Sequence, residues 1–256
     1  MNNIFIFIRR EWLIFIRDIS FYMLFYFLLP TLIYFFLFIP FSNVFNEFKN
    51  SGMIYDYHAI SSIIFICTCM VAFIIPLITV KRDKYDNQYL EYLSSANVNQ
   101  FQYSGFIFIW AIICSYIEFI VSLSILIQLN NSVNIYTNQI MQFFIIILPA
   151  ILLFSSLSLL LSNFIKNIES IIIVFLFLFM ILGFGSGLFI PIDYFSEKYI
   201  LLNKSYNFTY QLHGMFIQVL NNKTLGLGTF FIAFFVSGIF YGLHLLFLNW
   251  KSEAVK

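Results

Sequence analysis

Apolar stretches long enough to cross a bilayer recur along this chain, separated by short polar segments. A transmembrane helix needs about 20 predominantly apolar residues. Stretches of this length run over residues 21–41, 59–80, 101–128, 139–162, 170–190 and 227–248. The pattern therefore predicts an all-α integral membrane protein with six transmembrane helices, folded as one membrane domain over residues 1–256.

The first 20 residues form a different pattern, in which apolar and charged side chains divide the surface of a helix. At 100° per residue one arc holds Ile4, Phe5, Ile8, Trp12, Phe15, Ile16 and Ile19, and the other side holds Arg9, Arg10, Glu11, Arg17 and Asp18. Helices of this kind lie in the membrane interface. We predict an amphipathic cytoplasmic helix over residues 1–20, with Arg9, Arg10, Trp12 and Arg17 at the interface. The alternative is a basic extension of the first span that only fixes topology.

Two connections between the predicted spans are distinctive. Residues 81–100 form the most charged stretch of the chain and are expected to lie in water, either as a short helix that docks a partner or as a solvated connector. Residues 191–226 contain near-apolar pieces that are too short to span a bilayer. Such pieces are typical of interfacial or re-entrant helices, and here they suggest a lid over a cavity.

Composition and charge restrict the class of protein further. Hydrophobic residues make up 61% of the chain and charged residues 10%, against about 25% charged in soluble domains. The net charge of +1 and the lack of a basic stripe argue against a nucleic-acid partner. Nine of the 13 Lys and Arg residues fall on the side of the N-terminus, so both termini are expected in the cytoplasm and the protein in the cell membrane. Cys67, Cys69 and Cys114 lie in apolar segments and suggest neither a disulfide framework nor a metal site.

Three features, taken in order along the chain, resemble the permease subunit of export-type (type 2) ABC transporters. The first is the amphipathic helix before the first span. The second is the run Asp86-Asn87-Gln88-Tyr89-Leu90-Glu91-Tyr92-Leu93-Ser94 in the first cytoplasmic loop. The third is a Gly-rich end of the fifth span followed by Pro and an Asn-containing run, here Gly185-Ser186-Gly187-Leu188-Phe189-Ile190-Pro191 and then Tyr206-Asn207-Phe208-Thr209-Tyr210.

The resemblance implies a transport pathway between two permease subunits, either two copies or two homologues, driven by separate cytoplasmic ATPase subunits. These ATPases would dock on Asp86, Leu90, Glu91 and Leu93. No Gly-x-x-x-x-Gly-Lys-Ser/Thr phosphate loop occurs in the chain, so ATP and Mg are expected in the partner, and this chain is expected to bind no cofactor and to be no enzyme. The expected substrate is a hydrophobic or amphipathic compound, such as a drug-like molecule, a lipid or a lipid-linked glycan.

A few residues inside the predicted spans are candidates for the transport pathway. Glu118 is the only carboxylate well inside a span, where a charge costs about 2.5–3.5 kcal/mol, so it should face protein or a wet cavity. It is either functional, or protonated and satisfied by neighbouring hydroxyls. The other pathway candidates are Gly185, Gly187, Pro191, Tyr206 and Thr209.

Two other classes of protein were weighed against the export permease. An ATP-independent secondary transporter or channel is the main alternative, although no inverted repeat is evident. An intramembrane serine protease is disfavoured, because Ser186 and His244 should lie at opposite membrane faces and no Gly-x-Ser-Gly motif is present.

Overall fold

A computed structural model describes residues 2–42, 44–45, 55–85, 98–130, 135–165, 167–221 and 227–254. Every regular element in these ranges is helical, which confirms the all-α class. Five helices are long and apolar enough to cross a membrane: Phe25–Ser42, Tyr55–Asp83, Gln100–Leu129, Thr137–Leu161 and Gly228–Leu248. The architecture is that of a multi-pass membrane protein.

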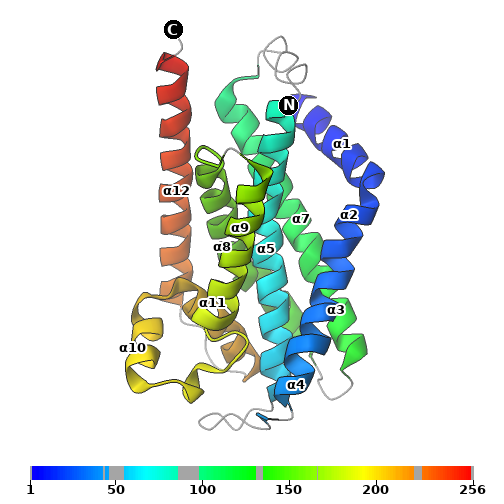
Figure 1. Cartoon of the computed structure of the whole chain (residues 1–256), viewed down its shortest axis with the longest axis vertical. Coiled ribbons are helices and arrows are strands. Elements are labelled where there is room, and N and C mark those ends of the chain that lie inside the picture. Colours follow the sequence, from blue (N-terminus) through cyan, green and yellow to red (C-terminus); the bar gives the residue numbers. More distant parts are fainter. Residues whose placement is uncertain are drawn as a thin grey trace.

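The long helices stand side by side and alternate in direction along the chain (Figure 1). Helix α5 (Tyr55–Tyr85) is central: it packs against α7 (Gln100–Leu129), α8 (Thr137–Leu161) and α9 (Ile168–Met180), and 94% of its apolar stretch is buried. Helix α12 (Leu227–Ala254) packs along α8. Both termini lie at the same end of the bundle, called here the terminal end, and the opposite end is the distal end.

The first span is helical throughout but changes its winding twice. It runs through α2 (Ile19–Met23), η1 (Leu24–Leu28), α3 (Leu29–Ile33), η2 (Tyr34–Phe38) and α4 (Ile39–Ser42). Both η1 and η2 are π-helical, and each ends two residues before a proline, Pro30 and Pro40. A proline ring clashes with the carbonyl four residues earlier, and the wider π turn relieves that crowding without ending the helix.

Pro76 inside α5 is accommodated by the neighbouring helix. Because proline has no N–H, the carbonyl of Ala72, four residues earlier, loses its helical donor. The Ser155 hydroxyl of α8 donates to the Ala72 carbonyl at 3.1 Å, and the Ser158 hydroxyl donates to the carbonyl of Phe73 at 2.5 Å. All of these groups are buried, so the hydroxyls of α8 satisfy backbone that lipid could not.

The helix at the fifth predicted span is shorter than expected. It comprises α9 and the π-helical η3 (Ile181–Gly185), an apolar run over Glu169–Gly185, and it ends five residues before the predicted boundary at residue 190. The chain then turns at Gly187, which has a left-handed φ of 71°. Phe189 folds back over Gly183, where a Cβ atom would lie 1.9 Å from its ring. The six-span layout is therefore not confirmed, since this run falls short of about 20 residues.

The segment predicted to hold short helices does hold them. After the 3₁₀ turn η4 (Ile192–Tyr194) come α10 (Glu197–Tyr206) and α11 (Phe208–Leu220), separated by Asn207. Much of α10 is exposed. By contrast, α11 packs against α5 and α8 and buries Leu212, Met215 and Phe216. Of these two short helices, α11 is therefore the one that forms part of the core at the distal end.

Candidate functional site

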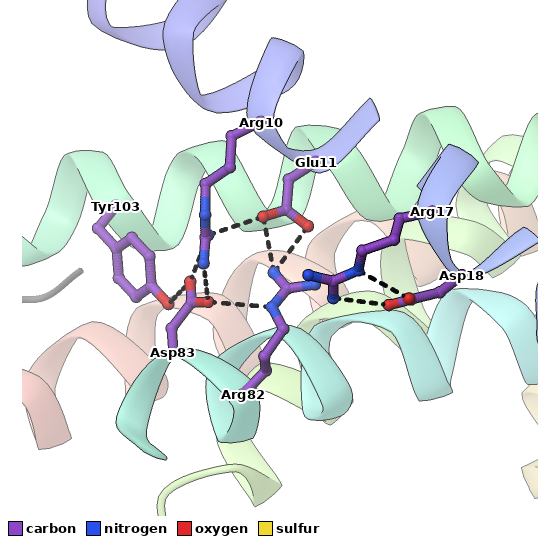
Figure 2. Close-up of polar contacts among 7 residues, drawn as sticks. All are labelled: Arg10, Glu11, Arg17, Asp18, Arg82, Asp83 and Tyr103. Atoms are coloured by element: carbon purple, nitrogen blue, oxygen red, sulfur yellow. Dashed lines mark hydrogen bonds and ion pairs between the residues drawn. The ribbon is translucent and has the colours of Figure 1, made fainter. Parts of the chain in front are cut away.

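A cluster of charged side chains joins the N-terminal helix to the terminal end of α5 (Figure 2). Helix α1 (Asn2–Arg17) contributes Arg10 and Glu11, α5 contributes Arg82 and Asp83, and α7 contributes Tyr103. We call these five residues the ionic clamp. Two of its bonds join sequence neighbours, Arg10 with Glu11 and Arg82 with Asp83, and the others connect groups that the sequence alone does not place together.

The bonds of the ionic clamp run mainly between helices. Arg10 donates to both carboxylate oxygens of Asp83, with Nη2 to Oδ1 at 2.7 Å and Nη1 to Oδ2 at 3.1 Å. Arg82 donates from Nη2 to both oxygens of Glu11, at 2.7 and 2.8 Å. The Tyr103 hydroxyl donates to Asp83 at 2.7 Å. Two arginines thus face two carboxylates, and the four formal charges balance.

The ionic clamp is withdrawn from solvent, which corrects the sequence analysis at two points. The side chains of Glu11 and Asp83 are 0% exposed, and those of Arg10 and Arg82 are 22% and 23% exposed. Residues 81–83 were expected to lie in water, but they form part of the last turns of α5, where Lys81 donates to the carbonyl of Ile165. Glu11 was expected on a solvated face of the N-terminal helix. Pairing across helices makes burial of these charges tolerable.

Helix α1 therefore does not present one intact apolar arc to its surroundings. Ile4, Ile8 and Phe15 of that arc are partly buried, whereas Phe5, Trp12 and Ile16 on its other half are 62%, 45% and 49% exposed. The helix is oriented so that Glu11 faces the bundle. Arg9 is exposed, and Trp12 stacks on Phe15 with ring centroids 5.5 Å apart. This helix is amphipathic, but one edge of it is bound to the bundle.

The pKa values of the two acidic residues near α1, Glu11 and Asp18, shift in opposite directions. Burial raises the pKa of Glu11, and Arg82 and Arg10 lower it by less. At the end of the helix Arg17 pairs with Asp18 at 2.9 Å, and this hydrogen bond lowers the pKa of Asp18. The side chains of Arg17 and Asp18 are 69% and 41% exposed, so that pair remains in contact with solvent and contributes little to stability.

The residues that the resemblance assigns to ATPase docking cannot be placed. Asp86, Leu90, Glu91 and Leu93 all lie outside the described residues. The structure does place both flanks of their segment, since α5 ends at Tyr85 and α7 begins at Gln100 at the terminal end. The preceding turn of α5 is the part held by the ionic clamp.

Three of the predicted pathway residues line one cavity of about 510 Å³ toward the distal end. They are Gly185 after α9, Tyr206 at the end of α10 and Thr209 at the start of α11. The remaining lining residues come mainly from α8, α9 and α12 and are mostly apolar: Leu153, Phe154, Leu157, Leu178, Ile181, Leu182, Leu202, Asn203, Asn207, Phe208, Val236 and Phe240. Gly187 and Pro191 do not line the cavity. They shape the adjoining turn, Gly187 by its left-handed φ and Pro191 by preceding η4.

Asn207 organises the polar end of this cavity. Its Nδ2 donates to Asn203 Oδ1 at 2.7 Å and lies 3.1 Å from the Ser186 hydroxyl. Its Oδ1 accepts from the backbone N–H of Tyr210 at 3.1 Å, which caps α11. Tyr199 donates its hydroxyl to the Gly185 carbonyl at 2.7 Å. The family-like run around Asn207 thus connects α10, α11 and the end of η3.

Glu118 does not line this cavity. It is fully buried in α7, where its Oε1 accepts from the Ser122 hydroxyl at 2.5 Å, and its Oε2 has no hydrogen-bond partner among the described residues. Glu118 therefore faces protein, as expected, and a neighbouring hydroxyl satisfies one of its oxygens. Its place in a transport pathway stays a prediction.

A buried pair of histidines is, with the ionic clamp, a polar feature that the sequence did not predict. Nε2 of His58 lies 3.4 Å from the Ser62 hydroxyl, and Nε2 of His213 lies 3.2 Å from the hydroxyls of both Ser61 and Ser62. The Ser61 hydroxyl donates to the His58 carbonyl. The Ser62 hydroxyl has one proton and can donate it to only one of the two imidazoles. The other imidazole must therefore donate its own N–H to the Ser62 oxygen. The pair ties α11 to α5 at the distal end.

His244 and Ser186, considered for a protease, have separate partners. His244 of α12 bonds to Ser104 at 2.9 Å and to Asn163 at 2.9 Å, near the start of α7 and the end of α8. Ser186 bonds to Asn207 in the turn that follows η3. All three cysteines are buried and free, and no cluster of metal ligands occurs among the described residues.

Comparison of this chain with family models, with curated proteins and with solved structures finds no match. No relative therefore lends it a function. The features of the chain that bear on its function are the ionic clamp, the distal cavity and the family-like sequence patterns.

Proposed function

We propose that this chain is the permease subunit of a membrane exporter driven by a separate ATPase. In this proposal the terminal end faces the cytoplasm, and the ATPase docks on Asp86, Leu90, Glu91 and Leu93 in the predicted loop 81–100. The substrate is a hydrophobic or amphipathic compound. The pathway forms with a second permease, identical or homologous. ATP and Mg belong to the ATPase subunit, because this chain has no phosphate loop.

The ionic clamp is the observation that supports this proposal most directly. A subunit that pushes on the predicted loop 81–100 would act on the end of α5, and the Arg10–Asp83 bonds would carry that motion into α1. Buried, mutually paired charges resist separation more strongly than exposed ones. The clamp therefore makes α1 and the end of α5 a single mechanical unit next to the predicted docking segment.

Co-purification tests the proposal. The chain is expressed together with its genomic neighbours and purified in detergent, and an ATPase subunit should be retained. Leu90→Asp with Glu91→Arg should abolish retention while the chain stays monodisperse. The matched control is Leu201→Asp with Glu197→Arg in α10, two exposed positions at the distal end. Equal retention by both double variants would place the docking surface elsewhere.

An ATP-independent transporter is the second candidate, and Glu118 supports it. Carboxyl groups inside membrane-spanning helices are found in proton relays, and Oε2 of Glu118 has no hydrogen-bond partner among the described residues. If the folded chain never retains an ATPase, this candidate replaces the first. Proton-driven uptake into vesicles, lost in Glu118→Gln, would then be the expected result.

A further inference from the structure

The distal cavity has an uneven chemistry that indicates what it binds. Among the residues that the structure describes, no charged side chain lines it. Its polar lining is gathered where α10 meets α11, at Asn203, Tyr206, Asn207 and Thr209. The rest of the wall is apolar and comes from α8, α9, η3 and α12, with Leu202 of α10 and Phe208 of α11 beside the polar groups. The cavity therefore has one neutral polar end and one hydrocarbon-like end.

The polar end is held in place before any ligand arrives. Asn203 is 5% exposed, and its amide both accepts from Asn207 and donates to the Tyr199 carbonyl at 3.1 Å. Asn207 is fixed in turn by its cap of α11. A site whose polar groups are already oriented loses little conformational entropy on binding. The rigidity of these amides favours recognition over chance filling by hydrocarbon.

We propose that this cavity binds an uncharged amphiphile, with its apolar chain against α8, α9 and α12 and its neutral hydrogen-bonding head at the α10–α11 junction. A charged head group would lose its hydration there and find no counter-charge. A ligand without a head would leave the amide end unused. The volume of about 510 Å³ falls within the range of about 300–1,000 Å³ usual for small-molecule sites.

The ligand reaches this cavity from the bilayer. Three of its lining side chains, Ile181, Leu202 and Tyr206, are 44%, 57% and 77% exposed, so its rim is open and carries two apolar side chains beside one tyrosine. That this ligand is the transported substrate, rather than a resident lipid, rests on the proposed function. Binding itself needs no ATPase, so the two proposals fail separately.

Photolabelling of the purified full chain, without any ATPase, tests the site. The probe is a monoacylglycerol with a diazirine in its acyl chain, compared with the fatty acid of the same chain and with an alkyl-trimethylammonium analogue. The neutral probe should label peptides covering residues 178–185 and 236–240 several-fold more than either charged probe. Equal labelling by all three probes, or labelling confined to other peptides, would overturn the proposal.

Two variants separate the cavity from the general lipid surface. Val236→Trp fills the cavity and should reduce labelling by the neutral probe about tenfold, the effect of a loss near 1.4 kcal/mol. Phe235→Trp, its neighbour on α12 at 71% exposure, should leave labelling unchanged. A similar loss in both variants would show that the probe only samples the surface.

A gain of binding protects the test against misfolding. Leu202→Lys places a cation at the exposed rim of the cavity and should shift the preference from the monoacylglycerol toward the fatty acid, which a damaged protein would not do. An unchanged preference would contradict the assigned head-group position. If the ligand is the substrate, the neutral probe must also inhibit the ATP-dependent export of the transported compound by the complex of this chain with its ATPase. Binding without competition would make it a resident lipid.

Discussion

Removing the charge of Asp83 should loosen α1 from the bundle. Asp83 accepts two bonds from Arg10 and one from Tyr103, and its side chain is 0% exposed. Loss of one partner of a buried ion pair costs about 3–5 kcal/mol. We expect Asp83→Asn to lie near the lower end, about 3 kcal/mol, because Arg10 also bonds to Glu11 at 2.9 Å and keeps a carboxylate partner.

The interaction of Arg10 with Asp83 should appear as a coupling energy. Two unit charges about 4 Å apart attract by about 4 kcal/mol at an effective dielectric constant near 20. A double-mutant cycle of Arg10→Gln and Asp83→Asn should recover part of this, about 1.5–3 kcal/mol, because each single variant leaves the clamp with one unbalanced charge and the double variant does not. Isosteric amides keep the packing nearly constant.

The assay is equilibrium unfolding in mixed detergent micelles, followed by tryptophan fluorescence. The control cycle uses Arg17→Gln and Asp18→Asn, whose bonds of 2.9 and 3.0 Å are as short as those of the clamp but lie at the surface. We expect no resolvable coupling there, since solvent screens the pair. A coupling for Arg10 and Asp83 no larger than this control would refute the clamp as a mechanical connection.

Three further predictions follow from buried contacts. Ser155→Ala should destabilise the protein by about 1–3 kcal/mol, because it strands the carbonyl freed by the proline of α5, whereas Ser124→Ala, on an exposed hydroxyl, should be nearly neutral in the same unfolding assay. Gly183→Ala should cost about 1–3 kcal/mol through overpacking, and Gly214→Ala, where a Cβ atom meets nothing within 4 Å, should not; equal melting temperatures would contradict this. Because burial raises the pKa of Glu11, its contribution to stability is present below its unfolded-state pKa of about 4.3 and is lost as the pH rises through the higher folded-state pKa. The stability of wild type should therefore fall relative to Glu11→Gln across that window, and parallel pH profiles would argue against it.

Apolar run length was sufficient to predict most of the fold. The predicted spans 59–80, 101–128 and 227–248 lie within α5, α7 and α12, which extend beyond them at one or both ends, and the span 139–162 overruns the end of α8 at Leu161 by one residue. Apolar run length does not register the polar residues that continue a helix. The stretch 170–190 failed at its end for a local reason. Its glycines allow the turn at Gly187 and the close approach of Phe189, which hydropathy does not register.

The candidate site was predictable only in part. Gly185, Tyr206 and Thr209 were chosen from the family-like pattern, and they share one cavity. The clamp escaped prediction because Arg10–Glu11 and Arg82–Asp83 are adjacent opposite charges in sequence, a pattern that looks self-neutralised on each helix. The bonds between its arginines and the carboxylates of the other helix join residues 71 to 73 positions apart. Periodicity carries no information about such long-range pairs.

Helix α5 is bonded to other segments of the chain at both of its ends. At about 1.5 Å per residue its 31 residues extend about 46 Å. One end holds the ionic clamp, and at the other Tyr55 donates its hydroxyl to the carbonyl of Phe189 at 2.9 Å, in the turn that closes the cavity wall. Hydroxyls of α8 bond to the backbone of α5 beside Pro76, so a bend of α5 at this point would either break these bonds or move α8 with it. A push delivered at the charged end would therefore reach the cavity turn as a displacement shared with α8.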